Sequence, residues 1–174
     1  MGVPAKMHYP VPAGARRQPT NNCWATTSGK VKYDRFHGGS DIKPSKAGQT
    51  GEAVEAAWRG VTVFVAKAGT EKPGTWGSDY GNRILIRHSF THRHSNGTVH
   101  KHDWFTFYAH LKSLRVTKSG VAVVEGALLA GVGNTGQSSA PHVHFALQMD
   151  PGYKVAVVDP FWRLEAARKE LLGA

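Results

Sequence analysis

Two histidines separated by one residue, His142 and His144, are the residues whose type and spacing most directly suggest chemistry. They follow a loop rich in Gly, Asn, Ser and Pro, and they lie in an alternating segment that is typical of a β-strand. Successive strand residues point to opposite faces, so both histidines share one face, with roots about 7 Å apart, while Val143 and Phe145 face a core. Such a pair can serve one small site, but it is equally compatible with half-buried polar residues on a sheet.

Two further segments supply candidate partners for this pair. In His37-Gly38-Gly39-Ser40-Asp41 the adjacent glycines disfavour a helix, and a glycine loop can bring His37 and Asp41 toward one point. Alternation in the segment 104–111 places His110 on a polar strand face together with Tyr108 and Thr106. Imidazole and carboxylate groups are the ligands of a catalytic zinc site, where three protein ligands leave a fourth position open. Cys23 is the only cysteine, which excludes an internal disulfide and a structural thiolate site.

Zinc held by such ligands would support peptide-bond hydrolysis. The metal lowers the pKa of bound water to about 7 and polarises a carbonyl. A nearby imidazole, with an ordinary pKa of about 6.5, can move the water's proton to the leaving amine, and a second can stabilise the oxyanion. The sequence has no His-Glu-x-x-His motif, so the base must be a histidine. Spacing alone does not decide which of His142 and His144 binds the metal, and a hydrogen-bonded surface histidine is the alternative for His110.

The elements that must position these residues are mostly strands. Alternation predicts strands over 60–66, 82–88 and 104–111, short strand pieces within 120–133, and a strand from 142. Short strands punctuated by glycine indicate an antiparallel, mostly β single domain. A short C-terminal helix is predicted over 159–172, because Asp159 suits the N-cap, Pro160 suits the first turn and an apolar stripe follows. Residues 1–29 are expected to be an extended lead-in to a core over about residues 30–160.

Several motifs, taken together and in order, carry a family resemblance. They are His37-x-Gly39-x-Asp41, Tyr80-Gly81-Asn82 before a strand ending in His88, Tyr108-Ala109-His110-Leu111, Gly133-x-Thr135-Gly136 and Pro141-His142-Val143-His144-Phe145. This combination resembles the M23 family of lysostaphin-like, LytM-type zinc metallopeptidases. The resemblance implies a lysostaphin-like fold and an endopeptidase that uses one zinc ion to cut peptide stems or cross-bridges of bacterial peptidoglycan. It assigns zinc to His37, Asp41 and His144, and it makes His110 and His142 the unligated catalytic pair.

Candidate substrate-binding residues surround these motifs. Trp76 lies in the glycine-rich loop 74–77, where binding explains an aromatic residue more easily than packing does. Tyr80 and Tyr108 adjoin the proposed site, and Ser138 precedes the histidine pair. Packing is the alternative role for the aromatic residues, and capping of the turn is the alternative for Ser138.

Residues 88–102 contain five histidines around Asn96-Gly97. Asn-Gly is a signal for the tip of a β-hairpin. The plain interpretation is a solvated hairpin between two strands, and a second metal site is the alternative.

The formal net charge of +10 favours association with polyanions. The sequence has no recognisable nucleic-acid-binding motif, so specific nucleic-acid binding is not expected. Residues 121–132, the most apolar stretch, are too short to span a bilayer and include Glu125. The expected partners are therefore peptidoglycan and anionic cell-wall polymers, with the protein acting as a monomer.

The start of the sequence bears on where the protein would act. Residues 1–22 lack the apolar segment of a secretory signal peptide. We expect action at the bacterial cell wall, and a phage-encoded lysin is an origin that agrees with this pattern. The rival hypothesis is an inactive wall-binding or scaffold domain of the same fold.

Overall fold

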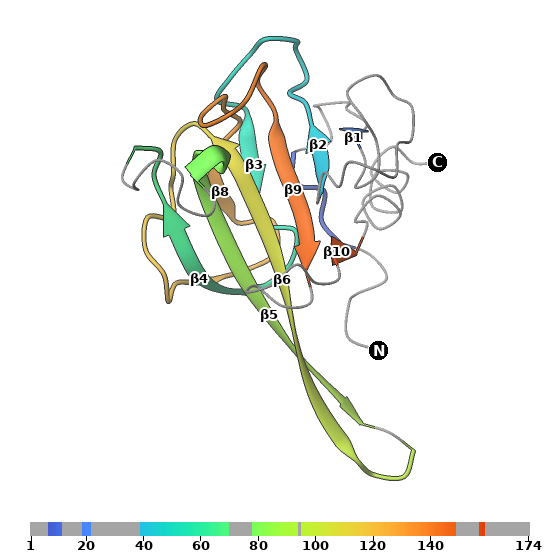
Figure 1. Cartoon of the computed structure of the whole chain (residues 1–174). Helices are drawn as coiled ribbons and strands as arrows, with labels where there is room; N and C mark the ends of the chain where they lie inside the picture. Colours follow the sequence, from blue (N-terminus) through green and yellow to red (C-terminus); the bar gives the residue numbers. More distant parts are fainter. Residues whose placement is uncertain are drawn as a thin grey trace.

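The computed structural model describes residues 7–11, 19–21, 39–69, 78–93, 95–148 and 157–158. Within these residues an eight-stranded sheet has the order β1-β2-β9-β6-β5-β4-β7, with β10 pairing with β9, and a second sheet pairs β3 with β8 (Figure 1). Every strand pairing is antiparallel. The strands are β1 (Pro19–Asn21), β2 (Ser40–Ile42), β3 (Ala53–Glu55), β4 (Gly60–Ala66), β5 (Asn82–Arg93), β6 (Val99–Leu111), β7 (Ala122–Val123), β8 (Leu128–Gly131), β9 (Val143–Gln148) and β10 (Val157–Val158).

The predicted mostly β, antiparallel fold is confirmed. Strand β4 has the predicted bounds, and β5 and β6 extend beyond theirs into a hairpin that closes around Asn96-Gly97. Gly97 has φ +85°, which a side chain would disfavour, so glycine suits this tip. The predicted helix 159–172 lies outside the described residues. Within the described part of the chain, no helix has the length and apolar character of a membrane span.

One face of the large sheet packs on the main core. Strand β9 contributes the predicted alternation of Val143, Phe145 and Leu147, all buried, while Ile84 and Ile86 come from β5. The short sheet of β3 and β8 closes this core from the other side, through buried residues that include Val54, Leu129 and Ala130.

The N-terminal segment 7–11 is also part of this core. Met7, Tyr9 and Val11 are buried, and their spacing of two places them on one side of an extended segment. The backbone N–H of Glu55 donates to Pro10 O at 2.8 Å, so the segment lies along β3. This alternation was readable in the sequence, although it was interpreted only as a lead-in.

Strand β6 departs from the predicted alternation at its end. Phe107 and Ala109 lie on the face opposite the core, with Ala146, Tyr80 and Leu85, whereas Tyr108 and Thr106 point inward. His110 has φ +58°, a left-handed conformation that is uncommon for a residue with a side chain. This conformation turns His110 to the face that Ala109 shares, so the face assignment made from strict alternation was wrong.

His88 is a second correction, because it is not a solvated hairpin residue. It is 2% exposed at the base of the hairpin. Its Nδ1 lies 2.8 Å from the Arg59 carbonyl oxygen, and its Nε2 lies 2.8 Å from Thr106 Oγ1. Since a carbonyl only accepts, Nδ1 donates and Nε2 accepts from the threonine hydroxyl.

Candidate metal and catalytic centre

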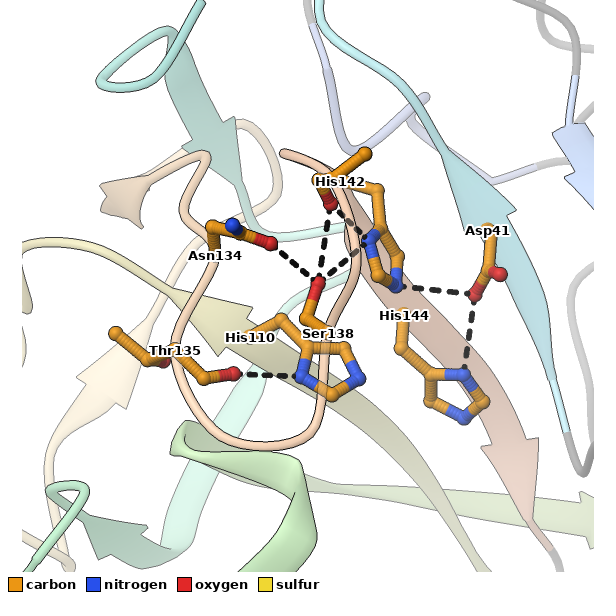
Figure 2. Close-up of polar contacts among 8 residues, drawn as sticks. Asp41, His110, Asn134, Thr135, Ser138, His142 and His144 are labelled. Carbon is orange, nitrogen blue, oxygen red and sulfur yellow. Dashed lines mark hydrogen bonds and ion pairs between the residues drawn. The ribbon is translucent and has the colours of Figure 1, made fainter. Parts of the chain in front are cut away.

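Asp41 and His144 meet because β2 pairs with β9. The register places Asp41 directly opposite His144, although the two residues are 103 positions apart. Asp41 Oδ1 lies 3.3 Å from His144 Nδ1, and both residues are buried (Figure 2). Two groups that were predicted to be ligands of one metal therefore lie side by side on the sheet.

His142 approaches the same carboxylate from just before β9. Its Nε2 lies 3.5 Å from Asp41 Oδ1, and its Nδ1 lies 2.8 Å from the carbonyl oxygen of Ala140. Because that carbonyl can only accept, His142 Nδ1 carries a proton and donates it. Ser138 Oγ lies 3.2 Å from the same Nδ1 and 2.6 Å from Asn134 Oδ1 (Figure 2).

His110 completes the group of imidazoles. Its ring centroid lies 4.7 Å from that of His142 and 6.2 Å from that of His144. Its Nδ1 donates to the Thr135 carbonyl oxygen at 2.8 Å, which leaves Nε2 as the acceptor. Burial lowers the pKa of His110 to about 4, with a smaller opposing effect from the Thr135 hydrogen bond. The ring is therefore neutral at pH 7.

The turn at 80–82 and the loop at 133–136 hold His110 in place. The backbone N–H of Asn82 donates to Thr135 Oγ1 at 2.9 Å, and the Thr135 hydroxyl donates to the Leu111 carbonyl at 2.8 Å. A Cβ at Gly133 would overlap the His110 carbonyl oxygen, and one at Gly81 would overlap Thr135. The glycines thus permit two segments to touch backbone to backbone beside a catalytic candidate.

The donor chemistry of this site fits zinc. Carboxylate oxygens and imidazole nitrogens are ligands that zinc accepts, and the site places the carboxylate of Asp41 beside the imidazole of His144. The described residues contain no complete group of three metal-ligating side chains. They contribute Asp41 and His144, and His37, the third predicted ligand, lies outside the described residues.

The predicted substrate-binding residues separate into three groups. Tyr80, in a 3-10 turn (Ser78–Tyr80), lies beside the site, with its ring centroid 5.3 Å from that of His144 and 6.1 Å from that of His110. Burial, followed by the negative charges of Asp79 and Asp41, raises the pKa of Tyr80, so its hydroxyl keeps its proton. Ser138 adjoins His142 as described above, and Trp76 lies outside the described residues.

Tyr108 is not available to a substrate. It is 0% exposed, and its hydroxyl oxygen accepts a hydrogen bond from the Ala57 backbone N–H at 2.8 Å. Its burial raises its pKa to about 12. The substrate-binding role predicted for Tyr108 is therefore replaced by a core role, because regular alternation in β6 turns residue 108 inward.

Sequence reasoning quoted the motifs of Asn82 and Thr135 but gave these residues no role. Asn82 Nδ2 donates to the carbonyls of Leu111 and Lys112 at 2.8 and 2.9 Å, so its side chain joins β5 to the end of β6. Thr135 supplies the carbonyl that fixes the His110 tautomer. Their positions directly after Gly81 and before Gly136 were the available signal, since polar residues in glycine turns often bond backbone groups.

Comparisons with known proteins agree with this geometry. Residues 35–157 match the profile of peptidase family M23. The DD-carboxypeptidase/endopeptidase Mpg of Neisseria meningitidis serogroup B is 29% identical over 165 residues, which are 94% of this chain and 30% of that protein. The chain thus spans about a third of the length of this curated relative.

Two solved structures resemble the fold. The catalytic domain of the antimicrobial peptidase lysostaphin from Staphylococcus simulans superposes with a TM-score of 0.54 and 25% identity, over 75% of this chain and 80% of that one. A zinc-containing peptidase from Vibrio cholerae gives a TM-score of 0.60 and 25% identity, over 90% of this chain and 39% of that one.

Proposed function

The chain belongs to peptidase family M23, and from this premise we propose that it is a zinc-dependent endopeptidase that cleaves peptide bonds in bacterial peptidoglycan. The observation that carries the proposal is the convergence of two imidazoles on one buried carboxylate, with a third imidazole beside them. Asp41 Oδ1 lies 3.3 Å from His144 and 3.5 Å from His142, and the ring of His110 lies beside both. The names of the relatives support hydrolysis of peptide bonds and a zinc-containing centre.

We infer that Asp41 and His144, together with His37, would hold the metal. When bound, zinc would polarise the scissile carbonyl and make its bound water acidic. The family resemblance assigns His110 and His142 to proton transfer and not to the metal; each donates its Nδ1 proton to a backbone carbonyl, so Nε2 is the ring position that can take a proton. An acceptor nitrogen next to the metal position suits a general base that later returns the proton to the leaving amine.

The neighbouring residues have supporting roles in this proposal. Tyr80 keeps its proton at neutral pH, so its hydroxyl can donate to a substrate oxygen. The +10 net charge supports attraction to anionic wall polymers, and action at the bacterial cell wall follows from the substrate class.

The test is the release of soluble peptide fragments from purified peptidoglycan. The intact chain should solubilise sacculi, a chelator should stop the reaction, and added Zn²⁺ should restore it. His110→Ala serves as the matched control, because it should bind sacculi without cleaving them. Binding without release by the unaltered, zinc-loaded chain would favour the alternative of an inactive wall-binding domain.

A further inference from the structure

The 3-10 turn Ser78–Tyr80 brings a second acidic residue to the edge of the proposed peptidase centre. Asp79 directly precedes Tyr80, whose ring centroid lies 5.3 Å from that of His144. Consecutive Cα atoms are about 3.8 Å apart, so Asp79 lies close to the residues of the centre. The function proposed above gives Asp79 no role, because Asp41 is the carboxylate assigned to the metal.

Two backbone contacts hold Asp79 against the loop that leads to His142. The Asp79 carbonyl oxygen accepts a hydrogen bond from the Gln137 backbone N–H at 2.7 Å. Gly136, at φ +72°, packs so closely that an added Cβ would overlap the same oxygen. The turn and the loop therefore meet backbone to backbone, and this contact keeps Asp79 beside the centre.

The Asp79 side chain is accessible to a ligand, because the residue is exposed. Within the part of the chain that the structure describes, its carboxylate makes no hydrogen bond or ion pair. The neighbouring cation, Arg83, is buried and donates from Nη1 to the Gly81 carbonyl oxygen at 3.0 Å. Its Cζ lies over the Phe64 ring, 5.2 Å from the ring centroid. The carboxylate of Asp79 is thus open to a partner that arrives with a substrate.

The negative charge of Asp79 also acts on the centre. Burial raises the pKa of Tyr80, and the charge of Asp79 raises it further, with a smaller contribution from Asp41. The ring of Tyr80 lies beside those of His144 and His110, so the field of Asp79 extends to the place where a substrate would bind. A positive group on the substrate would be attracted there.

We propose that Asp79 determines substrate specificity by binding the side-chain ammonium group of a basic residue near the scissile bond. This inference rests on the proposed peptidase function and adds a substrate class to it. An extended peptide rises by about 3.3 Å per residue, so an ammonium group one or two residues from the scissile bond is within reach. An exposed ion pair of this kind gives a preference of about two- to five-fold.

Two peptides of the same sequence test the proposal. One carries the free side-chain amine next to the scissile bond, and in the other this amine is acetylated. The unaltered chain should have a kcat/KM about two- to five-fold higher on the free amine. Asp79→Asn should abolish this preference by raising KM for the free amine alone, with kcat unchanged.

Asp103→Asn is the matched control, since it removes an exposed carboxylate toward the hairpin end of β6, away from His110. The asparagine keeps an oxygen that can accept the hydrogen bond from Ser89 Oγ. This variant has the same net charge as Asp79→Asn, and it should keep the preference for the free amine.

Charge reversal separates recognition from a structural role. Asp79→Lys should prefer a third peptide, in which succinylation makes the same side chain negative, over the free amine. Affinities measured by calorimetry in the His110→Ala chain give the same comparisons without turnover, because that chain should bind peptide and not cleave it.

The proposal is overturned if the unaltered chain cleaves and binds the free and acetylated peptides equally well, an outcome that leaves the peptidase function intact. It is overturned equally if Asp79→Asn retains the preference. A chain that cleaves neither peptide but binds the free amine more tightly than Asp79→Asn does would contradict the peptidase function and uphold the role of Asp79.

Discussion

Backbone carbonyls orient two imidazoles of the proposed centre. His110 and His142 each donate an Nδ1 proton to a carbonyl, those of Thr135 and Ala140, at 2.8 Å. A carbonyl cannot donate in return, so each of the two rings carries a proton on Nδ1. Asp41 contacts both His142 and His144 with the same oxygen, Oδ1.

Alanine substitutions of His142 and His144 should therefore have different effects on zinc binding and on turnover. His144→Ala removes a proposed ligand and should release zinc, because metal binding depends on the full ligand set. His142→Ala and His110→Ala should retain zinc and lower kcat by about 10²–10⁴-fold, the usual contribution of general acid–base catalysis. Metal analysis beside rates for the three variants checks this. Zinc lost from His142→Ala but kept in His144→Ala would reverse the assignment.

Ser138 is expected to act through His142 rather than through the substrate. Its hydroxyl donates to Asn134 Oδ1 at 2.6 Å, and its oxygen lies 3.2 Å from His142 Nδ1. Ser138→Ala should lower kcat less than His142→Ala does, because the Ala140 carbonyl still holds the ring. Steady-state kinetics on a soluble peptide separate the two roles. A raised KM with unchanged kcat would show that Ser138 binds substrate.

At the scale of strands and turns, the sequence predicts regular strands more accurately than strands with an irregular backbone. In β9 the alternation was predicted correctly, because the strand is regular and its apolar residues Val143, Phe145 and Leu147 all face the main core. In β6 it failed at His110, because a left-handed conformation such as φ +58° is uncommon for any residue with a side chain and interrupts the strand alternation. The contact of Asp41 with His144 depends on pairing between distant strands, which no local pattern encodes. Only the family motifs predicted that Asp41 and His144 belong to one site; periodicity did not.

The close backbone contact between Gly133 and the end of β6 should be essential for the stability of the loop at 133–136. A Cβ there would overlap the backbone of His110, Leu111 and Lys112, which no side-chain rotation can relieve. Gly133→Ala should therefore lower the free energy of unfolding by more than Gly97→Ala, where the added Cβ meets open space and only φ strain of about 1–2 kcal/mol applies. Urea unfolding of both variants gives the comparison. Equal losses would mean that the loop moves aside at little cost.

His88 should make stability fall in mild acid. Burial lowers its pKa below the ordinary value of about 6.5, although the hydrogen bond to Arg59 opposes the shift. The folded state therefore favours the neutral ring, so the stabilisation is complete above pH 6.5 and is lost as the pH falls toward the folded pKa. The free energy of unfolding should decrease from pH 7 to pH 5 more steeply in the unaltered chain than in His88→Gln. His110, also shifted downward by burial, is present in both proteins and cancels. Parallel pH profiles would show that His88 is not the cause.

At the scale of the whole molecule, binding of the chain to an intact cell wall should depend on salt concentration. The net charge of +10 attracts anionic polymers, and physiological salt shortens the reach of exposed charges to about 8 Å. Raising the ionic strength should weaken binding to isolated walls in a sedimentation assay. Cleavage of a small uncharged peptide is the control and should change little. A similar loss with the small peptide would remove wall attraction as the explanation.

The pairing of β2 with β9 has a consequence for when the proposed centre can form during synthesis of the chain. Asp41 and His144 are 103 residues apart, and β9 must enter between β2 and β6 before they can meet. Contacts between such distant segments form late, because closing a long loop costs entropy before the contact compensates for it. A ribosome that has released residue 41 but not residue 144 therefore presents only a fragment of the centre. We expect the nascent chain to remain inactive until residue 144 has emerged from the ribosome.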